Sequence, residues 1–140
     1  MLTRMIYVST AVGPVTTAVT GTILRSAQAH NAAHGITGVL CQGQGAYLQV
    51  LEGERGKLDA LYARILVDKR HQNIELRQVE GIARRRYGKW SMAHVDLVQA
   101  NAQIAARLSD FDPNTHAGEK LMAQIDSLIA AGTVMKAPVV

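Results

Sequence analysis

The chain has 140 residues, of which 48% are hydrophobic and 19% charged, a composition typical of a soluble globular domain with a sizeable core. The net charge of +4 is modest and aromatic residues make up only 4%, which argues against nucleic-acid binding by base stacking. The single cysteine, Cys41, excludes an intrachain disulfide and a cysteine-rich zinc site, and no apolar run is long enough to span a membrane. The first residues carry no apolar signal region, so we expect a cytoplasmic protein.

Seven elements follow from the spacing of apolar residues and from the glycine and proline breaks between them. We expect them in the order strand, helix, strand, strand, helix, strand, strand, at residues 4–9, 17–34, 36–41, 47–53, 54–68, 73–82 and 89–95. This order matches a ferredoxin-like α/β sandwich with one added strand, in which a mixed sheet carries two helices on one face.

The remainder of the chain contains two further stretches of helical periodicity, separated by Asp112-Pro113-Asn114. The predicted strands are apolar on both sides, so the face that the two helices leave open also needs cover. We therefore expect a domain at residues 1–95 and a helical C-terminal extension at residues 96–140 that packs on the sheet. From about residue 132 the chain is expected to fray.

Three polar side chains are set within apolar elements, where each unmet hydrogen bond of a buried group costs about 1 to 3 kcal/mol. Gln49 interrupts an apolar strand, and Tyr7 lies within the first strand. Asn31 follows Leu24 by seven positions and so returns to the apolar side of the first helix. If the strand faces of Tyr7 and Gln49 look toward the helices, these side chains can meet. Together the three groups are typical of a slot for a flat ligand with polar edges.

Each of these residues also has a structural explanation that the sequence leaves open. A strand tyrosine is usually part of the core, and a buried asparagine near a helix end often bonds loose carbonyls. Arg64 and Asp68 are spaced i,i+4 and could form an ordinary surface pair. Their order, with the base first, is the weaker one for helix support, which mildly favours a site.

Motifs of common catalytic and cofactor sites are absent from the sequence. Gly43 and Gly45 lack the lysine and the following helix of a phosphate loop. His30 and His34 are spaced i,i+4, but no third metal ligand is evident, so we expect no metal site. The residues alone leave open a chromophore-free ferredoxin-like enzyme, a ligand-binding protein or a nucleic-acid adaptor.

Five segments, taken together, resemble the BLUF domains, which are flavin-based sensors of blue light. They occur in family-like order and spacing over about residues 2–95, at Arg4–Ser9, His30–Gly38, Leu48–Gly53, Asp68–His71 and Trp90–Met92. The resemblance implies a non-enzymatic photoreceptor of the short, single-domain type. It would bind FAD non-covalently, with the isoalloxazine ring between the two helices.

The resemblance also implies roles for individual residues. Tyr7 and Gln49 would be the photoactive pair: Tyr7 gives up an electron and then a proton, and the Gln49 amide rearranges its hydrogen bonds. Trp90 and Met92 would relay the change. The residues implied in flavin binding are Asn31 and Gln49 at the polar edge, Arg64 and Asp68 at the pyrimidine end, Ile23 and Ile65 against the ring, and His30 and His71 nearby.

Two positions depart from the family pattern: Tyr47 stands where phenylalanine is common, and Cys41-Gln42 replaces the more usual aromatic character. We expect no attached effector domain, so the resemblance implies output through a partner protein. A cyclic-dinucleotide phosphodiesterase and a response-regulator-like protein are the candidates by analogy, and a homo-oligomer is also implied. The residues do not distinguish FAD from FMN.

Overall fold

The computed structural model describes residues 1–13, 17–43, 45–89, 91–96, 123, 125–127, 129–130 and 133–135. Its elements are β1 (Leu2–Ala11), α1 (Thr17–His34), β2 (Thr37–Gly43), β3 (Ala46–Glu54), α2 (Arg55–Leu66), β4 (His71–Gly81), β5 (Ala93–Asp96) and β6 (Thr133–Met135). The strands form one sheet in the order β4-β1-β3-β2-β5-β6, and neighbours are antiparallel except for β2 and β5, which are parallel. The predicted ferredoxin-like fold with a mixed sheet is therefore confirmed.

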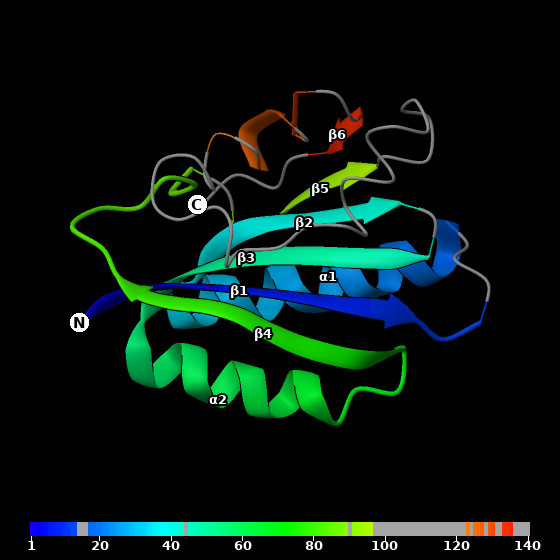
Figure 1. Ribbon diagram of the computed structural model, residues 1–140, viewed down its shortest axis with the longest axis horizontal. Helices are drawn as coiled ribbons and strands as arrows, with labels where there is room; N and C mark the ends of the chain where they lie inside the picture. Colours follow the sequence, from blue (N-terminus) through cyan, green and yellow to red (C-terminus); the bar gives the residue numbers. More distant parts are fainter. Residues whose placement is uncertain are drawn as a thin grey trace.

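Successive side chains of a strand point to opposite faces of the sheet, so each face forms its own buried cluster. On one face, Met5 of β1 and Leu51 of β3 belong to a buried cluster with Leu24 of α1 and Leu58 of α2. Figure 1 shows α1 behind the central strands and α2 below β4. On the other face a second buried cluster includes Ile125 from the C-terminal part of the chain. The predicted division into two domains stays a prediction, because most of residues 97–140 lie outside the described ones.

The limits of α2 are set by two acidic residues that bond backbone N–H groups. Glu54 is the N-cap, and its carboxylate accepts hydrogen bonds from the backbone N–H groups of Gly56 and Lys57 at 2.9 and 3.3 Å. The prediction that this helix extends to Asp68 is wrong, since the helix ends at Leu66. Asp68 instead accepts a hydrogen bond from the backbone N–H of Arg70 at 2.9 Å, and this local bond favours a turn over another helical turn.

A buried ion pair crosses the face of the sheet opposite to the helices. Glu52 of β3 is fully buried, and its Oε2 lies 2.9 Å from both Nε and Nη2 of Arg4 on β1. Arg4 also donates to Glu80 of β4 at 3.1 Å. The register explains this arrangement, because Arg4 is directly opposite Glu52 on one side and Glu80 on the other. The three side chains therefore bridge the strands β3, β1 and β4.

The same carboxylate holds the loop that follows β4. Glu52 accepts hydrogen bonds from the backbone N–H groups of Arg86 and Tyr87 at 3.0 and 2.7 Å. The side chains of Arg86 and Tyr87 in turn donate to Asp126, at 2.6 Å from the guanidinium and 2.8 Å from the phenol. Glu52 thus joins β3 to this loop, and the loop to the C-terminal part of the chain.

The end of the sheet differs from the prediction in two respects. The strand expected at residues 89–95 is β5 at Ala93–Asp96, so Met92 precedes the strand, and Trp90 lies outside the described residues. The expected fraying from residue 132 is wrong for Thr133–Met135, which pairs with β5 as β6. Pairing with a distant strand cannot be read from three residues of sequence. Within the described residues, no helix has the length and apolar character needed to cross a membrane.

Candidate functional site

A cavity lies between the two helices and the sheet. Its volume is about 130 Å³, roughly ten times the space that a single buried water needs. The lining residues are Tyr7, Ile23, Ser26, Ala27, His30, Asn31, Leu40, Tyr47, Gln49, Leu61, Arg64, Ile65, Asp68, Arg70 and His71. Nine of the eleven residues singled out from the sequence are therefore brought together at one cavity. Of the other two, Met92 is not part of the lining, and Trp90 lies outside the described residues.

Tyr7 and Gln49 face each other across the β1–β3 pair, where they occupy opposite positions in the register. The Tyr7 hydroxyl donates a hydrogen bond to Oε1 of Gln49, and both side chains are buried. Burial, and secondarily the negative charge of Asp68, raises the pKa of Tyr7 far above its usual value. The phenol therefore stays protonated at neutral pH and keeps its hydrogen to donate.

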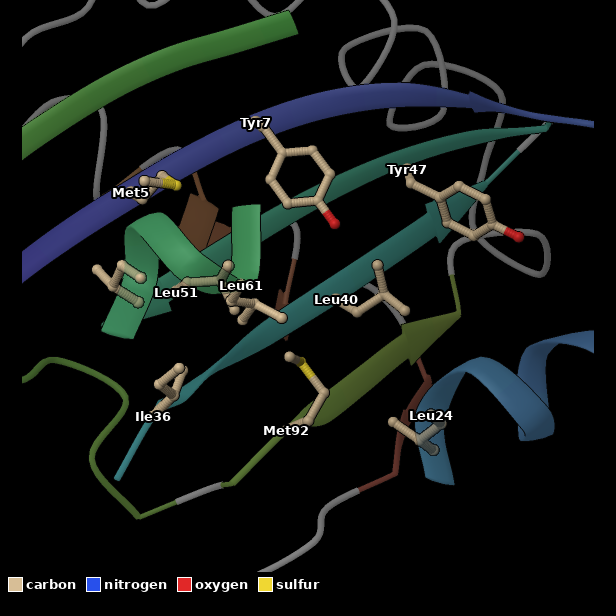
Figure 2. Close-up of a cluster of buried hydrophobic side chains, with 10 residues drawn as sticks. Met5, Tyr7, Leu24, Ile36, Leu40, Tyr47, Leu51, Leu61 and Met92 are labelled. Atoms are coloured by element: carbon tan, nitrogen blue, oxygen red, sulfur yellow. The ribbon is translucent and has the colours of Figure 1, made fainter. Parts of the chain in front are cut away.

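The other end of the Gln49 amide contacts a sulfur atom. Its Nε2 lies 3.6 Å from Sδ of Met92, which is fully buried and is drawn in Figure 2 with its sulfur directed into the buried cluster. A thioether is a weak acceptor, and a phenol hydroxyl can either donate or accept. If the Gln49 amide rotates so that its oxygen and nitrogen change places, the hydroxyl of Tyr7 can accept instead of donate. The rotation therefore loses only the weak contact with the Met92 sulfur.

Asn31 has the opposite property, because its orientation is fixed. Its Nδ2 donates to the backbone carbonyl of Ser91 at 2.9 Å, and a carbonyl can only accept, so the amide nitrogen must face Ser91. The fully buried Oδ1 has no hydrogen-bond partner within the described residues. An unmet buried acceptor costs about 1 to 3 kcal/mol. The cavity therefore offers a fixed acceptor to a ligand N–H.

Basic side chains from the two helices meet at one side of the cavity, His30 from α1 and Arg64 from α2. The guanidinium of Arg64 contacts Nδ1 of His30, which must accept and is therefore unprotonated. Desolvation, followed by the nearby His34 and Arg64, lowers the pKa of His30. The His30 and His34 rings stack at 4.2 Å with 19° between their planes, and His34 Nδ1 donates to the His30 carbonyl at 2.8 Å. At neutral pH the contact of Arg64 is thus with an uncharged ring.

The turn after α2 places a second group at the cavity. Arg70 donates to Asp68 through Nε at 2.9 Å and Nη2 at 2.6 Å, and this hydrogen bonding lowers the pKa of Asp68. Asp68 therefore pairs with Arg70, and the surface pair with Arg64 that the sequence left open is not formed among the described residues. The i,i+4 geometry requires one continuous helix, and Asp68 lies beyond its end.

His71 is held on both sides by elements that flank the cavity. Its Nε2 lies 3.0 Å from the Ile65 carbonyl, which can only accept, so Nε2 carries the proton. The Nδ1 atom is then free to accept from the Ser9 hydroxyl at 2.8 Å. The ring lies edge-on to Tyr7 and Tyr47, at centroid distances of 6.2 and 6.5 Å. His71 thereby connects β1 and α2 beside the photoactive pair predicted from the sequence.

Comparison with known proteins gives these features a family. A sequence model described as sensors of blue light using FAD matches residues 2–93. The chain belongs to the BLUF family. The photoactivated adenylate cyclase subunit alpha-like protein FB of Euglena gracilis is 32% identical over 112 residues, which is 80% of this chain and 10% of that relative. The chain thus spans only a small part of the length of the curated relatives that it matches.

Solved structures of BLUF proteins share the fold. The dark-state structure of BlrB is 30% identical, has a TM-score of 0.72, and is matched over 93% of this chain and 96% of that one. Klebsiella pneumoniae BlrP1, in a structure with FMN and cyclic diGMP, is 25% identical with a TM-score of 0.71 over 93% of this chain and 35% of that one. The cofactor class of the family is therefore flavin.

The BLUF cavity of this chain fits a flavin on chemical grounds. An oxidised isoalloxazine ring carries a single ring N–H between two carbonyl groups, and the fixed Oδ1 of Asn31 is an unmet acceptor for such a group. Ile23 and Ile65 offer apolar surface from the two helices, as expected for the faces of a flat ring.

Three polar residues of this BLUF cavity were not assigned to the site from the sequence: Ser26, Tyr47 and Arg70. Arg70 was part of a recognised segment but received no role, and its spacing of two from Asp68 was the available indication. Tyr47 was noted as a departure from the family pattern that adds a hydroxyl near the site, on the strand face of Gln49, but it received no role. Met92 was implied only as a residue that relays the change, and its sulfur contacts Gln49; Trp90 lies outside the described residues.

Proposed function

We propose that this BLUF protein senses blue light through FAD bound in the cavity between α1 and α2. Tyr7 serves as the donor of an electron and a proton, and Gln49 serves as the switch. The observation that carries this proposal is the buried chain of contacts from Tyr7 through Gln49 to Met92. This chain lies beside a cavity whose lining can accommodate a flavin.

The residue types suit these roles. A bound oxidised flavin becomes a strong electron acceptor when blue light excites it. A phenol that loses an electron becomes strongly acidic, and the Tyr7 hydrogen already lies in a hydrogen bond to Oε1 of Gln49. The proton therefore has a direct path to the amide, which can rotate or tautomerise because neither Tyr7 nor Met92 fixes its orientation. A stronger amide hydrogen bond to a flavin carbonyl would shift the flavin absorption to longer wavelength.

The cavity residues divide the work of holding the cofactor. Asn31 would accept from the ring N–H, and its bond to Ser91 keeps it fixed while Gln49 changes. Asp68 and Arg64 would bound the pyrimidine end, and His30 and His71 would lie at its margins. The choice of FAD over FMN is supported by the family description.

The output path runs from Met92 into the edge of the sheet. Met92 directly precedes β5, and β5 pairs with both β2 and β6. A changed contact between Gln49 and Met92 would therefore move strands that border the C-terminal part of the chain. We infer a non-enzymatic cytoplasmic receptor, a homo-oligomer, that acts on a partner protein. An enzyme of cyclic-nucleotide or cyclic-dinucleotide metabolism, or a response-regulator-like protein, is the candidate partner.

An absorption difference spectrum before and after blue illumination tests the proposal. Protein loaded with FAD should show a small red shift of the flavin band that decays in darkness. Tyr7→Phe and Gln49→Leu should both bind flavin and lose the shift. Tyr62→Phe is the matched control, because its ring lies 6.1 Å from Tyr7 but does not line the cavity. A normal shift in Tyr7→Phe, or a protein that takes up no flavin, would contradict the proposal.

A further inference from the structure

Tyr47 carries a buried hydroxyl that meets no partner in the part of the chain that the structure describes. It lies on β3, two residues before Gln49 and on the same face, and it lines the cavity with an exposed fraction of 3%. Its hydroxyl has no hydrogen-bond partner among the described residues. Figure 2 shows Tyr7 and Tyr47 on neighbouring strands, with the Tyr47 hydroxyl directed away from Tyr7. The photoactive pair therefore does not account for this group.

A buried phenol hydroxyl normally finds a partner. Tyr7 donates to Gln49, and the other buried phenol, Tyr87, donates to Asp126. Phenylalanine would fill the same space as Tyr47 without an unmet polar atom, so the hydroxyl is a net cost unless a ligand satisfies it. Desolvation raises the pKa of Tyr47, so the hydroxyl is neutral and has one hydrogen to donate.

We propose that the Tyr47 hydroxyl is a further flavin-binding group, which donates a hydrogen bond to an oxygen or nitrogen acceptor of the bound cofactor. This inference rests on the proposed function. Two buried atoms without partners among the described residues then define what the ligand must offer. Oδ1 of Asn31 on α1 requires an N–H donor, and the hydroxyl of Tyr47 on β3 requires an acceptor. Flavins present both kinds of group. The departure from phenylalanine at this position thus becomes a determinant of affinity.

Flavin titration of Tyr47→Phe measures the contribution of this single hydroxyl. Apoprotein is titrated with FAD, FMN and riboflavin, and flavin fluorescence reports the dissociation constant. A typical hydrogen bond corresponds to an affinity change of about 2- to 13-fold, so Tyr47→Phe should weaken binding by that factor. Tyr62→Phe removes a phenol hydroxyl that does not line the cavity, and it should bind like the wild type.

The outcomes separate this inference from the proposed function. If the wild type and Tyr47→Phe bind all three flavins equally well, the role of Tyr47 is refuted, while flavin sensing stands. If the wild type binds none of them, both proposals fail. Equal weakening in Tyr47→Phe and Tyr62→Phe would also refute a specific contact, because it would indicate a general loss of packing.

Thermal unfolding gives a second readout that does not depend on the photocycle. Saturating flavin stabilises the folded state in proportion to the logarithm of its affinity. The rise of the unfolding midpoint on flavin addition should therefore be smaller for Tyr47→Phe than for the wild type and Tyr62→Phe. Identical rises in all three proteins would overturn the inference.

Discussion

Glu52 offers the sharpest test of the energetics, because one fully buried carboxylate satisfies three separate groups. Its Oε2 accepts from the Arg4 guanidinium and from the Arg86 backbone N–H, and its Oε1 accepts from the Tyr87 backbone N–H. In Glu52→Gln one of these oxygens becomes an NH2 group. In either orientation of the glutamine amide, its NH2 group faces an N–H donor, either of Tyr87 or of Arg4 and Arg86. At least one buried N–H group therefore loses its acceptor.

The expected loss follows from these contacts. Removing one partner of a buried ion pair costs about 3 to 5 kcal/mol. Arg4 keeps its hydrogen bond to Glu80 at 3.1 Å, so we expect a value near the lower end, about 3 kcal/mol. A domain of this kind is stable by about 5 to 15 kcal/mol, and the urea slope is about 1 to 3 kcal/mol per molar. The urea midpoint, followed by circular dichroism, should therefore fall by about 1 to 3 M.

Glu80→Gln is the matched control for this measurement. Glu80 has a side chain that is 33% exposed and a single contact with Arg4, so its loss should cost no more than about 1 kcal/mol. If Glu52→Gln unfolds within 1 kcal/mol of the wild type, or if the two variants lose the same stability, the reasoning about burial is refuted.

Two further predictions concern a close backbone approach and a pH dependence. A Cβ at Gly38 would lie 2.0 Å from the backbone oxygen of Val50, so Gly38→Ala should destabilise by about 3 kcal/mol or more in urea unfolding. Gly21→Ala in α1 meets no backbone atom outside its own helix and should stabilise by about 0.5 to 1 kcal/mol; the opposite order would disprove the argument. The hydrogen bonds from Arg70 lower the pKa of Asp68 in the folded state. Ionised Asp68 therefore stabilises the fold above the pKa of the unfolded state, about 3.9, and this stabilisation is lost as pH falls through the pKa of the folded state. Asp68→Asn should therefore be less stable than the wild type at pH 7, with a gap that narrows toward pH 3; a gap independent of pH would exclude this linkage.

The sequence identified most of the cavity because local periodicity decides which way a side chain points. Alternation along β1 and β3 put Tyr7 and Gln49 on the helix-facing side, and the seven-residue spacing from Leu24 put Asn31 there as well. The resemblance to BLUF domains then supplied the cofactor, which no spacing in the chain encodes. The same local rules failed at Asp68, where a side-chain bond to the backbone ends α2.

The sequence by itself determined the order of the elements, the apolar character of both sheet faces and the residues aimed at the cavity, since these depend on neighbours a few positions apart. Only the tertiary structure decided that Asp68 pairs with Arg70, that Gln49 contacts Met92 and that Thr133–Met135 joins the sheet. It also decided that a polar atom of Asn31 and one of Tyr47 find no hydrogen-bond partner among the described residues at the cavity. These facts depend on which of many possible partners reaches a given atom, and the partner of Gln49 lies 43 residues away along the chain.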